Sequence, residues 1–123
     1  MTKRFDNFPD LCSELAFDLK DRLEADARLS VQFGASNQSC SRYVNIDVLD
    51  DDDDYVDDAE FKVRFSDHDD RHGSDITIRI DDLITTITDD DDEYVAVEIA
   101  EDDYQAALAQ AEAAVAAHIG KVL

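Results

Sequence analysis

The spacing of apolar residues changes twice along this chain of 123 residues, and these changes limit the folds it can form. Near each end, apolar residues recur at steps of three and four, which predicts two amphipathic helices. The first helix is expected over residues 10–28, and the second runs through an alanine-rich segment that ends near Gly120, a stop signal. Asp102 and Asp103 stand at the start of the second helix, where carboxylates favour its positive end. The repeating residues are Leu11, Cys12, Leu15, Ala16, Leu19 and Leu23 in the first helix, and Tyr104, Leu108, Ala111, Val115 and Ile119 in the second.

Between the helices the apolar period is two, which places the apolar side chains of each segment on one side of a β-strand. The alternating sets are Leu29, Val31 and Phe33; Val44, Ile46 and Val48; Phe61, Val63 and Phe65; Ile76, Ile78 and Ile80; and Val95, Val97 and Ile99. The β-branched segment 83–88 could form a further short strand.

This order predicts an α+β fold in which an antiparallel sheet of four to six strands has both helices packed on its apolar face. Short connections favour a meander. The length fits one domain over residues 1–123, because domains cluster at about 100–150 residues.

The charge of the chain is concentrated in its centre. The net charge is −21, and residues 45–103 hold 24 acidic and 4 basic residues. The acidic runs fall between the expected strands, so the loops carry the excess. We expect the following loop acids to form the main contact surface for a partner: Asp50, Asp51, Asp52, Asp53, Asp54, Asp57, Asp58, Asp89, Asp90, Asp91, Asp92 and Glu93.

Two interpretations would explain this acidity by a function. Carboxylates two residues apart on an extended segment lie roughly 7 Å apart on one side, so they can imitate the phosphates of nucleic acid in a basic groove. Alternatively, acid-rich and lysine-poor sequences suit a cytoplasm of high salt, which predicts acids on every exposed surface. The nearly balanced helix faces argue against salt adaptation. A single acidic run would be explained as a solvated loop, but four runs repel one another enough to need a reason.

Metal binding and catalysis find little support in the motifs. A calcium loop needs Gly at its sixth position and Glu at its twelfth, but counting from Asp50 these are Tyr55 and Phe61. We therefore expect no specific metal site, only loose and weak cation binding. His68 and His72 lie four apart beside Gly73 and several acids, which favours loop histidines held by carboxylates over a zinc site.

The remaining features predict a cytoplasmic protein that is not an enzyme and binds no cofactor. No nucleophile or phosphate-loop motif is present. Cys12 and Cys40 lack CxxC spacing and are expected to be buried thiols or incidental residues. There is no apolar run of the roughly 20 residues that a membrane span needs, and no secretory signal. A surface this negative should be repelled by anionic lipid and by nucleic acid itself.

Two segments resemble a pattern in small phage-encoded proteins: residues 39–44 (Ser-Cys-Ser-Arg-Tyr-Val) and 62–68 (Lys-Val-Arg-Phe-Ser-Asp-His). By size and charge the whole chain is also similar to the acidic DNA mimics that phages use against host defence, namely anti-CRISPR and anti-restriction proteins. The resemblance implies an inhibitor, acting as a monomer or homodimer. Its expected partner is a basic nucleic-acid-binding protein or complex, with a CRISPR-Cas subunit as the first candidate.

The arrangement of the acidic loops depends on segment 83–88. In a plain meander, the loops after Val48 and Ile80 reach the same end of the sheet and their acids merge into one patch. If 83–88 is a strand, the run at 89–93 moves to the opposite end and the patch divides.

Overall fold

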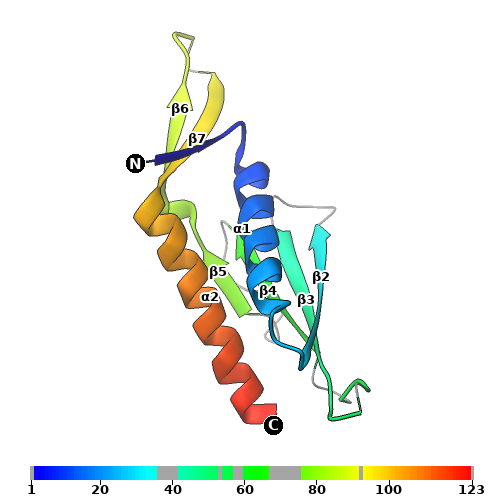
Figure 1. Ribbon diagram of the computed structural model, residues 1–123. Coiled ribbons are helices and arrows are strands. Elements are labelled where there is room, and N and C mark those ends of the chain that lie inside the picture. The colour runs from blue at the N-terminus through cyan, green and yellow to red at the C-terminus, as the bar shows by residue number, and fades with distance from the viewer. Residues whose placement is uncertain are drawn as a thin grey trace.

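The computed structural model of the chain describes residues 2–35, 42–52, 54–56, 60–66, 76–91 and 93–122. Within these residues the chain forms two α-helices, one short 3-10 helix and seven strands (Figure 1). In chain order the elements are β1 (Thr2–Phe5), α1 (Phe8–Leu23), β2 (Leu29–Ala35), β3 (Arg42–Val48), β4 (Phe61–Ser66), β5 (Ile76–Arg79), η1 (Asp81–Leu83), β6 (Ile84–Thr88), β7 (Tyr94–Ala100) and α2 (Glu101–Val122). The predicted α+β class and both predicted helices are confirmed.

The strands form two sheets, so the prediction of one antiparallel meander is wrong. Sheet B has the strand order β2-β3-β4-β5, and sheet A has the order β1-β7-β6. Neighbouring strands are antiparallel except β4 and β5, which run parallel. Short connections favour antiparallel pairing but do not require it. The connection over residues 67–75 lies outside the described residues.

The core lies between the helices and one face of sheet B. Helix α1 covers β2, β3 and β4, while α2 lies beside α1 and along β5 and β7 (Figure 1). Six side chains predicted to lie on the apolar face of the sheet, beneath the helices, are all buried. Five of them belong to sheet B, and Val97 belongs to sheet A. These residues are Val44, Ile46, Phe61, Val63, Ile78 and Val97.

Helix α1 begins and ends earlier than the apolar spacing alone predicts. The Asn7 side chain accepts a hydrogen bond from the backbone N–H of Asp10 at 2.8 Å, and Pro9 occupies the first turn. The helix ends at Leu23 because the following residues form a turn around Asp26. The Asp26 carboxylate accepts from the backbone N–H of Arg28 at 2.9 Å and from its guanidinium at 2.7 Å. These contacts hold the pKa of Asp26 below its ordinary value.

Helix α2 is longer than predicted at both ends. Its first turn already contains Glu101, and it continues past Gly120 to Val122. The expected stop at Gly120 is wrong because this glycine does not adopt the left-handed conformation that a glycine stop uses. The alanine-rich sequence lets α2 pack closely beside α1, and its residues Tyr104, Leu108 and Ala111 are fully buried there.

Sheet A contains one strand that the sequence pattern did not indicate and one that it left open. Strand β1 is only four residues long and pairs with β7 over residues 97–100. Segment 83–88 does form a strand, β6, which makes a hairpin with β7 that projects beyond the helices (Figure 1). The pairing is irregular near Ile87 and Thr88. Val95 is therefore 43% exposed, although its period-two partners Val97 and Ile99 are buried.

Candidate acidic interface

The first acidic run forms a tight turn over residues 50–54, here called the first acidic turn. The chain reverses after β3, since Leu49 bridges to Tyr55 and the N–H of Val56 donates to the carbonyl of Val48 at 2.8 Å. At the tip, the N–H of Asp50 donates to the carbonyl of Asp54 at 2.8 Å. The Asp50 carboxylate in turn accepts the backbone N–H groups of Asp52 at 2.9 Å and Asp54 at 3.0 Å.

The run at 89–93 repeats this geometry at the tip of the β6–β7 hairpin, and is called the second acidic turn. The N–H of Asp89 donates to the carbonyl of Glu93 at 2.9 Å. The Asp89 carboxylate accepts the N–H groups of Asp91 and Glu93, both at 2.9 Å. Two segments far apart in sequence thus use the same device, in which a leading aspartate satisfies two amides of its own turn.

This geometry separates the acids of each turn into two kinds. Asp50 and Asp89 hold the backbone, whereas the other described acids of each turn expose their side chains to solvent. The described acids of both turns are exposed: Asp50, Asp51, Asp52, Asp54, Asp89, Asp90, Asp91 and Glu93. Of the predicted contact residues, Asp53, Asp57, Asp58 and Asp92 lie outside the described residues. None of the ion pairs found in the described part of the chain involves an acid of either turn.

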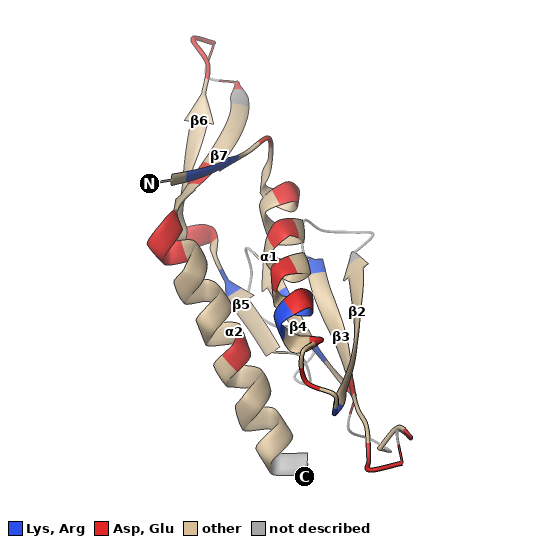
Figure 2. Ribbon diagram, in the orientation of Figure 1, with Lys and Arg blue, Asp and Glu red and all other residues tan. Residues whose placement is uncertain are grey.

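The two acidic turns lie at opposite ends of the molecule (Figure 2). The second turn is at the tip of the projecting hairpin, and the first lies beyond the far end of sheet B, near the level of the last turns of α2. The merged patch expected of a plain meander is therefore not formed. The divided arrangement follows from β6, because this additional strand sends the chain away from sheet B before the second run begins.

Helix α1 adds a row of acids to a solvent face that is expected from the sequence to be nearly balanced in charge. Its exposed acids recur at helical spacing on one stripe, and Figure 2 shows them between the two turns along the long axis of the molecule. This α1 stripe consists of Asp10, Glu14, Asp21 and Glu24. At its centre the ring of Phe17 stacks on that of Phe33 in β2, with centroids 4.3 Å apart. The 3.6-residue recurrence of these acids was the signal that could have revealed the stripe.

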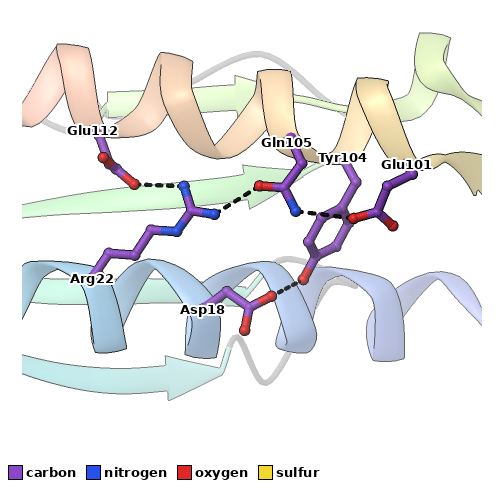
Figure 3. A network of polar contacts seen from close by, with 6 residues as sticks. All are labelled: Asp18, Arg22, Glu101, Tyr104, Gln105 and Glu112. Atoms are coloured by element: carbon purple, nitrogen blue, oxygen red, sulfur yellow. Dashed lines mark hydrogen bonds and ion pairs between the residues drawn. The ribbon is translucent and has the colours of Figure 1, made fainter.

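Of the two basic residues of α1, Arg22 is engaged with α2, whereas Lys20 pairs with one acid of the stripe. Arg22 donates to Glu112 at 2.8 Å and to Gln105 at 2.7 Å, and both acceptors belong to α2 (Figure 3). Gln105 also donates to Glu101 at 3.1 Å. Lys20 forms an ion pair with Glu24 one turn further along α1.

A second polar contact between the helices joins Tyr104 of α2 to Asp18 of α1. The Tyr104 hydroxyl donates to the Asp18 carboxylate, and the ring is fully buried (Figure 3). Burial raises the pKa of Tyr104 well above its ordinary value, and the hydrogen bond to Asp18 adds to the rise. The helix pair is thus joined by polar as well as apolar contacts.

The face of sheet B that points away from the helices is mixed in charge, as the sequence suggests for the polar side of the strands. The ring of Tyr43 lies over Gly34, its partner in the neighbouring strand. Lys62 Nζ lies 4.7 Å from the centroid of this ring, and the guanidinium carbon of Arg64 lies 5.7 Å from it. Lys62 and Arg64 are only partly exposed, whereas the described acids of the turns are exposed.

The described part of the chain shows neither a metal-binding cluster nor a membrane-spanning helix. Among these residues, no three His, Cys, Asp or Glu side chains are grouped so that they could hold a metal ion. His68, His72 and Cys40 lie outside them, and Cys12 is buried. No helix in the described segments is long and apolar enough to cross a membrane.

Comparison with known proteins does not extend this description. No protein-family model, curated protein or solved structure matches the chain. Function therefore has to be argued from the arrangement of charge on the fold.

Proposed function

We propose that this protein is a nucleic-acid mimic that inhibits a host defence complex by occupying its basic nucleic-acid groove, with a CRISPR effector as the first candidate partner. The observation that carries the proposal is the pair of acidic turns with the same backbone geometry at the two ends of the molecule. Their exposed carboxylates are ready to meet the Lys and Arg side chains that normally bind phosphate.

The dimensions of the molecule suit this role. Helix α2 has 22 residues and so spans roughly 33 Å, which compares with about 34 Å for one turn of duplex DNA. The α1 stripe adds carboxylates between the ends, over a helical rise of roughly 21 Å. A single copy can therefore reach basic sites that DNA contacts about one helical turn apart.

The backbone of the acidic turns is also preorganised for binding. In each turn two backbone amides are held by the leading aspartate, so the backbone that carries the neighbouring carboxylates is ordered in the free protein. Aspartate side chains are short, which keeps the charge close to that backbone. Less conformational entropy is then lost on binding than a flexible acidic tail would lose.

The solvent face of α2 weighs against salt adaptation, the competing interpretation. A protein adapted to high salt should carry acids on all exposed surfaces. After its first turn, α2 instead exposes mostly alanine and glutamine, and its single further acid, Glu112, forms an ion pair with Arg22. The exposed uncharged residues are Gln105, Ala106, Ala109, Gln110, Ala113, Ala116, Ala117 and Gly120. The acids are placed selectively, as a binding surface requires.

A competition experiment with a purified CRISPR effector tests the proposal. Fluorescence anisotropy of labelled target DNA reports whether the protein displaces DNA from the effector at about 0.15 M salt. The turn variants D51N/D52N and D90N/D91N each remove two charges and should weaken competition about three- to tenfold, mainly through a slower on-rate. Combining them should weaken it further.

The matched control is D6N/E60Q, which removes two exposed charges outside the turns and the α1 stripe. It should change competition less than twofold, because charge at these positions is not part of the proposed surface. If the control and turn variants lose competition equally, the loss is explained by net charge alone. Failure to displace DNA from CRISPR effectors, with type I restriction enzymes tested alongside, would overturn the proposal.

A further inference from the structure

Among the described residues, strand β6 is an edge of sheet A. It pairs with β7 on one side and is the last strand of the sheet on the other. Its sequence, Ile-Thr-Thr-Ile-Thr, contains no charge and no proline, and Thr85, Thr86 and Thr88 are exposed. Edge strands of natural sheets usually carry charges, prolines or a covering segment, because their outward N–H and C=O groups can pair with another chain.

The charge around β6 distinguishes it from the other strand edges. Strand β1 carries Lys3 and Arg4, β5 carries Arg79, and the uncharged β2 follows Arg28. Strand β5 also has acids near both of its ends, Asp75 and Asp81, but it carries Arg79, which forms an ion pair with Asp81 at 2.9 Å. Strand β6 has acids near both ends and no charge of its own: Asp82 in η1 precedes it, beside the paired Asp81, and the second acidic turn follows it.

We propose that the β6 edge binds an extended segment of a basic protein partner, which adds to sheet A as a fourth strand. The proposal rests on the proposed function, and it names how the partner engages the acidic end of the molecule. Main-chain hydrogen bonds to β6 supply affinity that does not depend on sequence. Basic residues at both ends of the added strand, separated by the roughly 17 Å length of β6, meet η1 on one side and the second acidic turn on the other.

A second copy of this chain fits the same edge poorly. If two β6 strands pair antiparallel about Thr86, Asp82 of each copy lies opposite Asp90 of the other, and Asp81 lies opposite Asp91. At each end of the paired strands, acidic residues of the two copies then lie opposite each other, which disfavours the pairing. Charge complementarity therefore selects a basic strand from a different protein.

Two synthetic peptides of equal charge test the strand pairing. The first, Lys-Lys-Val-Thr-Val-Thr-Val-Lys-Lys, can extend as a strand, and the second replaces its central valine by proline, which cannot donate to the ladder. At about 0.15 M salt, the first peptide should bind about tenfold more tightly than the second. Amide exchange measured by NMR should slow at outward-facing residues of β6 with the first peptide alone.

Proline variants of the protein supply the reciprocal test. Successive residues of a strand direct their N–H groups to opposite sides, so one of T85P and T86P removes an outward N–H and the other disrupts pairing with β7. The variant that better retains its melting temperature is used. With this variant, the two peptides should bind with equal affinity. Equal binding of both peptides without protection of β6 would overturn the proposal. Self-association through β6, detected as a dimer that the same variant dissociates, would also overturn it.

The two proposals can fail separately. If the protein displaces DNA from the effector but the two peptides behave alike, the acidic turns act without strand pairing. If the first peptide pairs with β6 but no effector is inhibited, the edge remains a binding site and the mimicry proposal fails. Lack of binding by either peptide contradicts the strand proposal, and the effector competition then decides the other.

Discussion

At the scale of single residues, identical side chains in the acidic runs do different work. In the sequence, residues 50–54 are five aspartates with nothing to distinguish them. In the fold, Asp50 accepts two backbone N–H groups while Asp51 and Asp52 face solvent. The same division separates Asp89 from Asp90 and Asp91. The stability of the turns and the charge of the interface are therefore carried by different members of each run.

We predict that D50A and D89A each lower the free energy of unfolding by about 1 kcal/mol, because two amides lose their acceptor. D50N should cost less, since its amide oxygen can still accept. D51A and D90A should stay within about 0.5 kcal/mol of the parent or raise stability by relieving repulsion. Urea unfolding monitored by circular dichroism gives these values. A loss for D51A equal to that for D50A would contradict the division of roles.

Replacing Gly34 or Gly120 by alanine should have opposite effects on stability. A Cβ added at Gly34 would lie 2.2 Å from Cε2 of Tyr43, so G34A must displace a ring packed across the strand pair. We expect a loss of about 1–3 kcal/mol. A Cβ at Gly120 would meet nothing within 4 Å, and G120A should stabilise α2 by about 0.5–1 kcal/mol. Thermal unfolding of both variants checks the pair, and a neutral G34A would show that Tyr43 moves freely.

At the scale of elements, the pairing of α1 with α2 combines an apolar seam with two polar contacts. Leu15 and Leu19 of α1 are fully buried, as is Leu108 of α2. Arg22 and Asp18 of α1 reach acceptor and donor groups of α2 beside this seam (Figure 3). Hydrogen bonds of this kind specify the alignment of the helices, because sliding one helix along the other would break them together.

The Tyr104 contact predicts how stability depends on pH. The pKa of Tyr104 is raised in the folded protein, so folding favours the protonated phenol. This contribution is fully present below the unfolded pKa of about 10 and is lost as the pH rises through the higher folded pKa. The free energy of unfolding should therefore fall as the pH rises above about 10, and Y104F should fall less steeply. At neutral pH, Y104F should cost about 1–2 kcal/mol. Parallel pH curves for the two proteins would contradict this account.

At the scale of the whole molecule, the distribution of charge is more informative than its sum. The net charge of −21 opposes compaction, yet the chain forms a core that contains 25 buried apolar residues among those described. The acids gather on the two turns, η1, the start of α2 and the α1 stripe, while the middle of α2 carries only Glu112, which is paired with Arg22 (Figure 2). Such selective placement is expected of a surface that meets a basic partner.

We predict that the protein is folded at about 0.15 M salt and becomes moderately more stable at molar salt, as repulsion between exposed acids is screened. Circular dichroism and thermal unfolding over this range measure the effect. D51N/D52N/D90N/D91N should show a smaller gain with salt, because four of the repelling charges are absent. A chain that unfolds near 0.15 M salt and folds only at molar salt would instead support salt adaptation.

Apart from β1, which it did not indicate, and β6, which it left open, the sequence by itself determined which segments become helix or strand and which side of each is buried. Leu11 to Leu23 and the alternating residues of β3 and β4 carry their period locally, because the geometry of a helix or strand needs no distant partner. The loops between elements could also be predicted, because the acidic runs cannot be buried and must lie outside the strands. The positions of both acidic turns along the chain, and the possible strand before the second, followed from these local patterns.

Only the tertiary structure decided how the strands pair and where the turns lie. An alternating strand fits either neighbour in either direction, so nothing in residues 76–79 specified a parallel place beside β4. Strand β1 has charged residues and only four positions, so β7 alone makes it a strand. The separation of the acidic turns, and the selection of Asp50 and Asp89 as their internal acceptors, depend on the path of the backbone in three dimensions. Local periodicity contains no information about that path, because strand pairing is set by contacts between residues far apart in the chain.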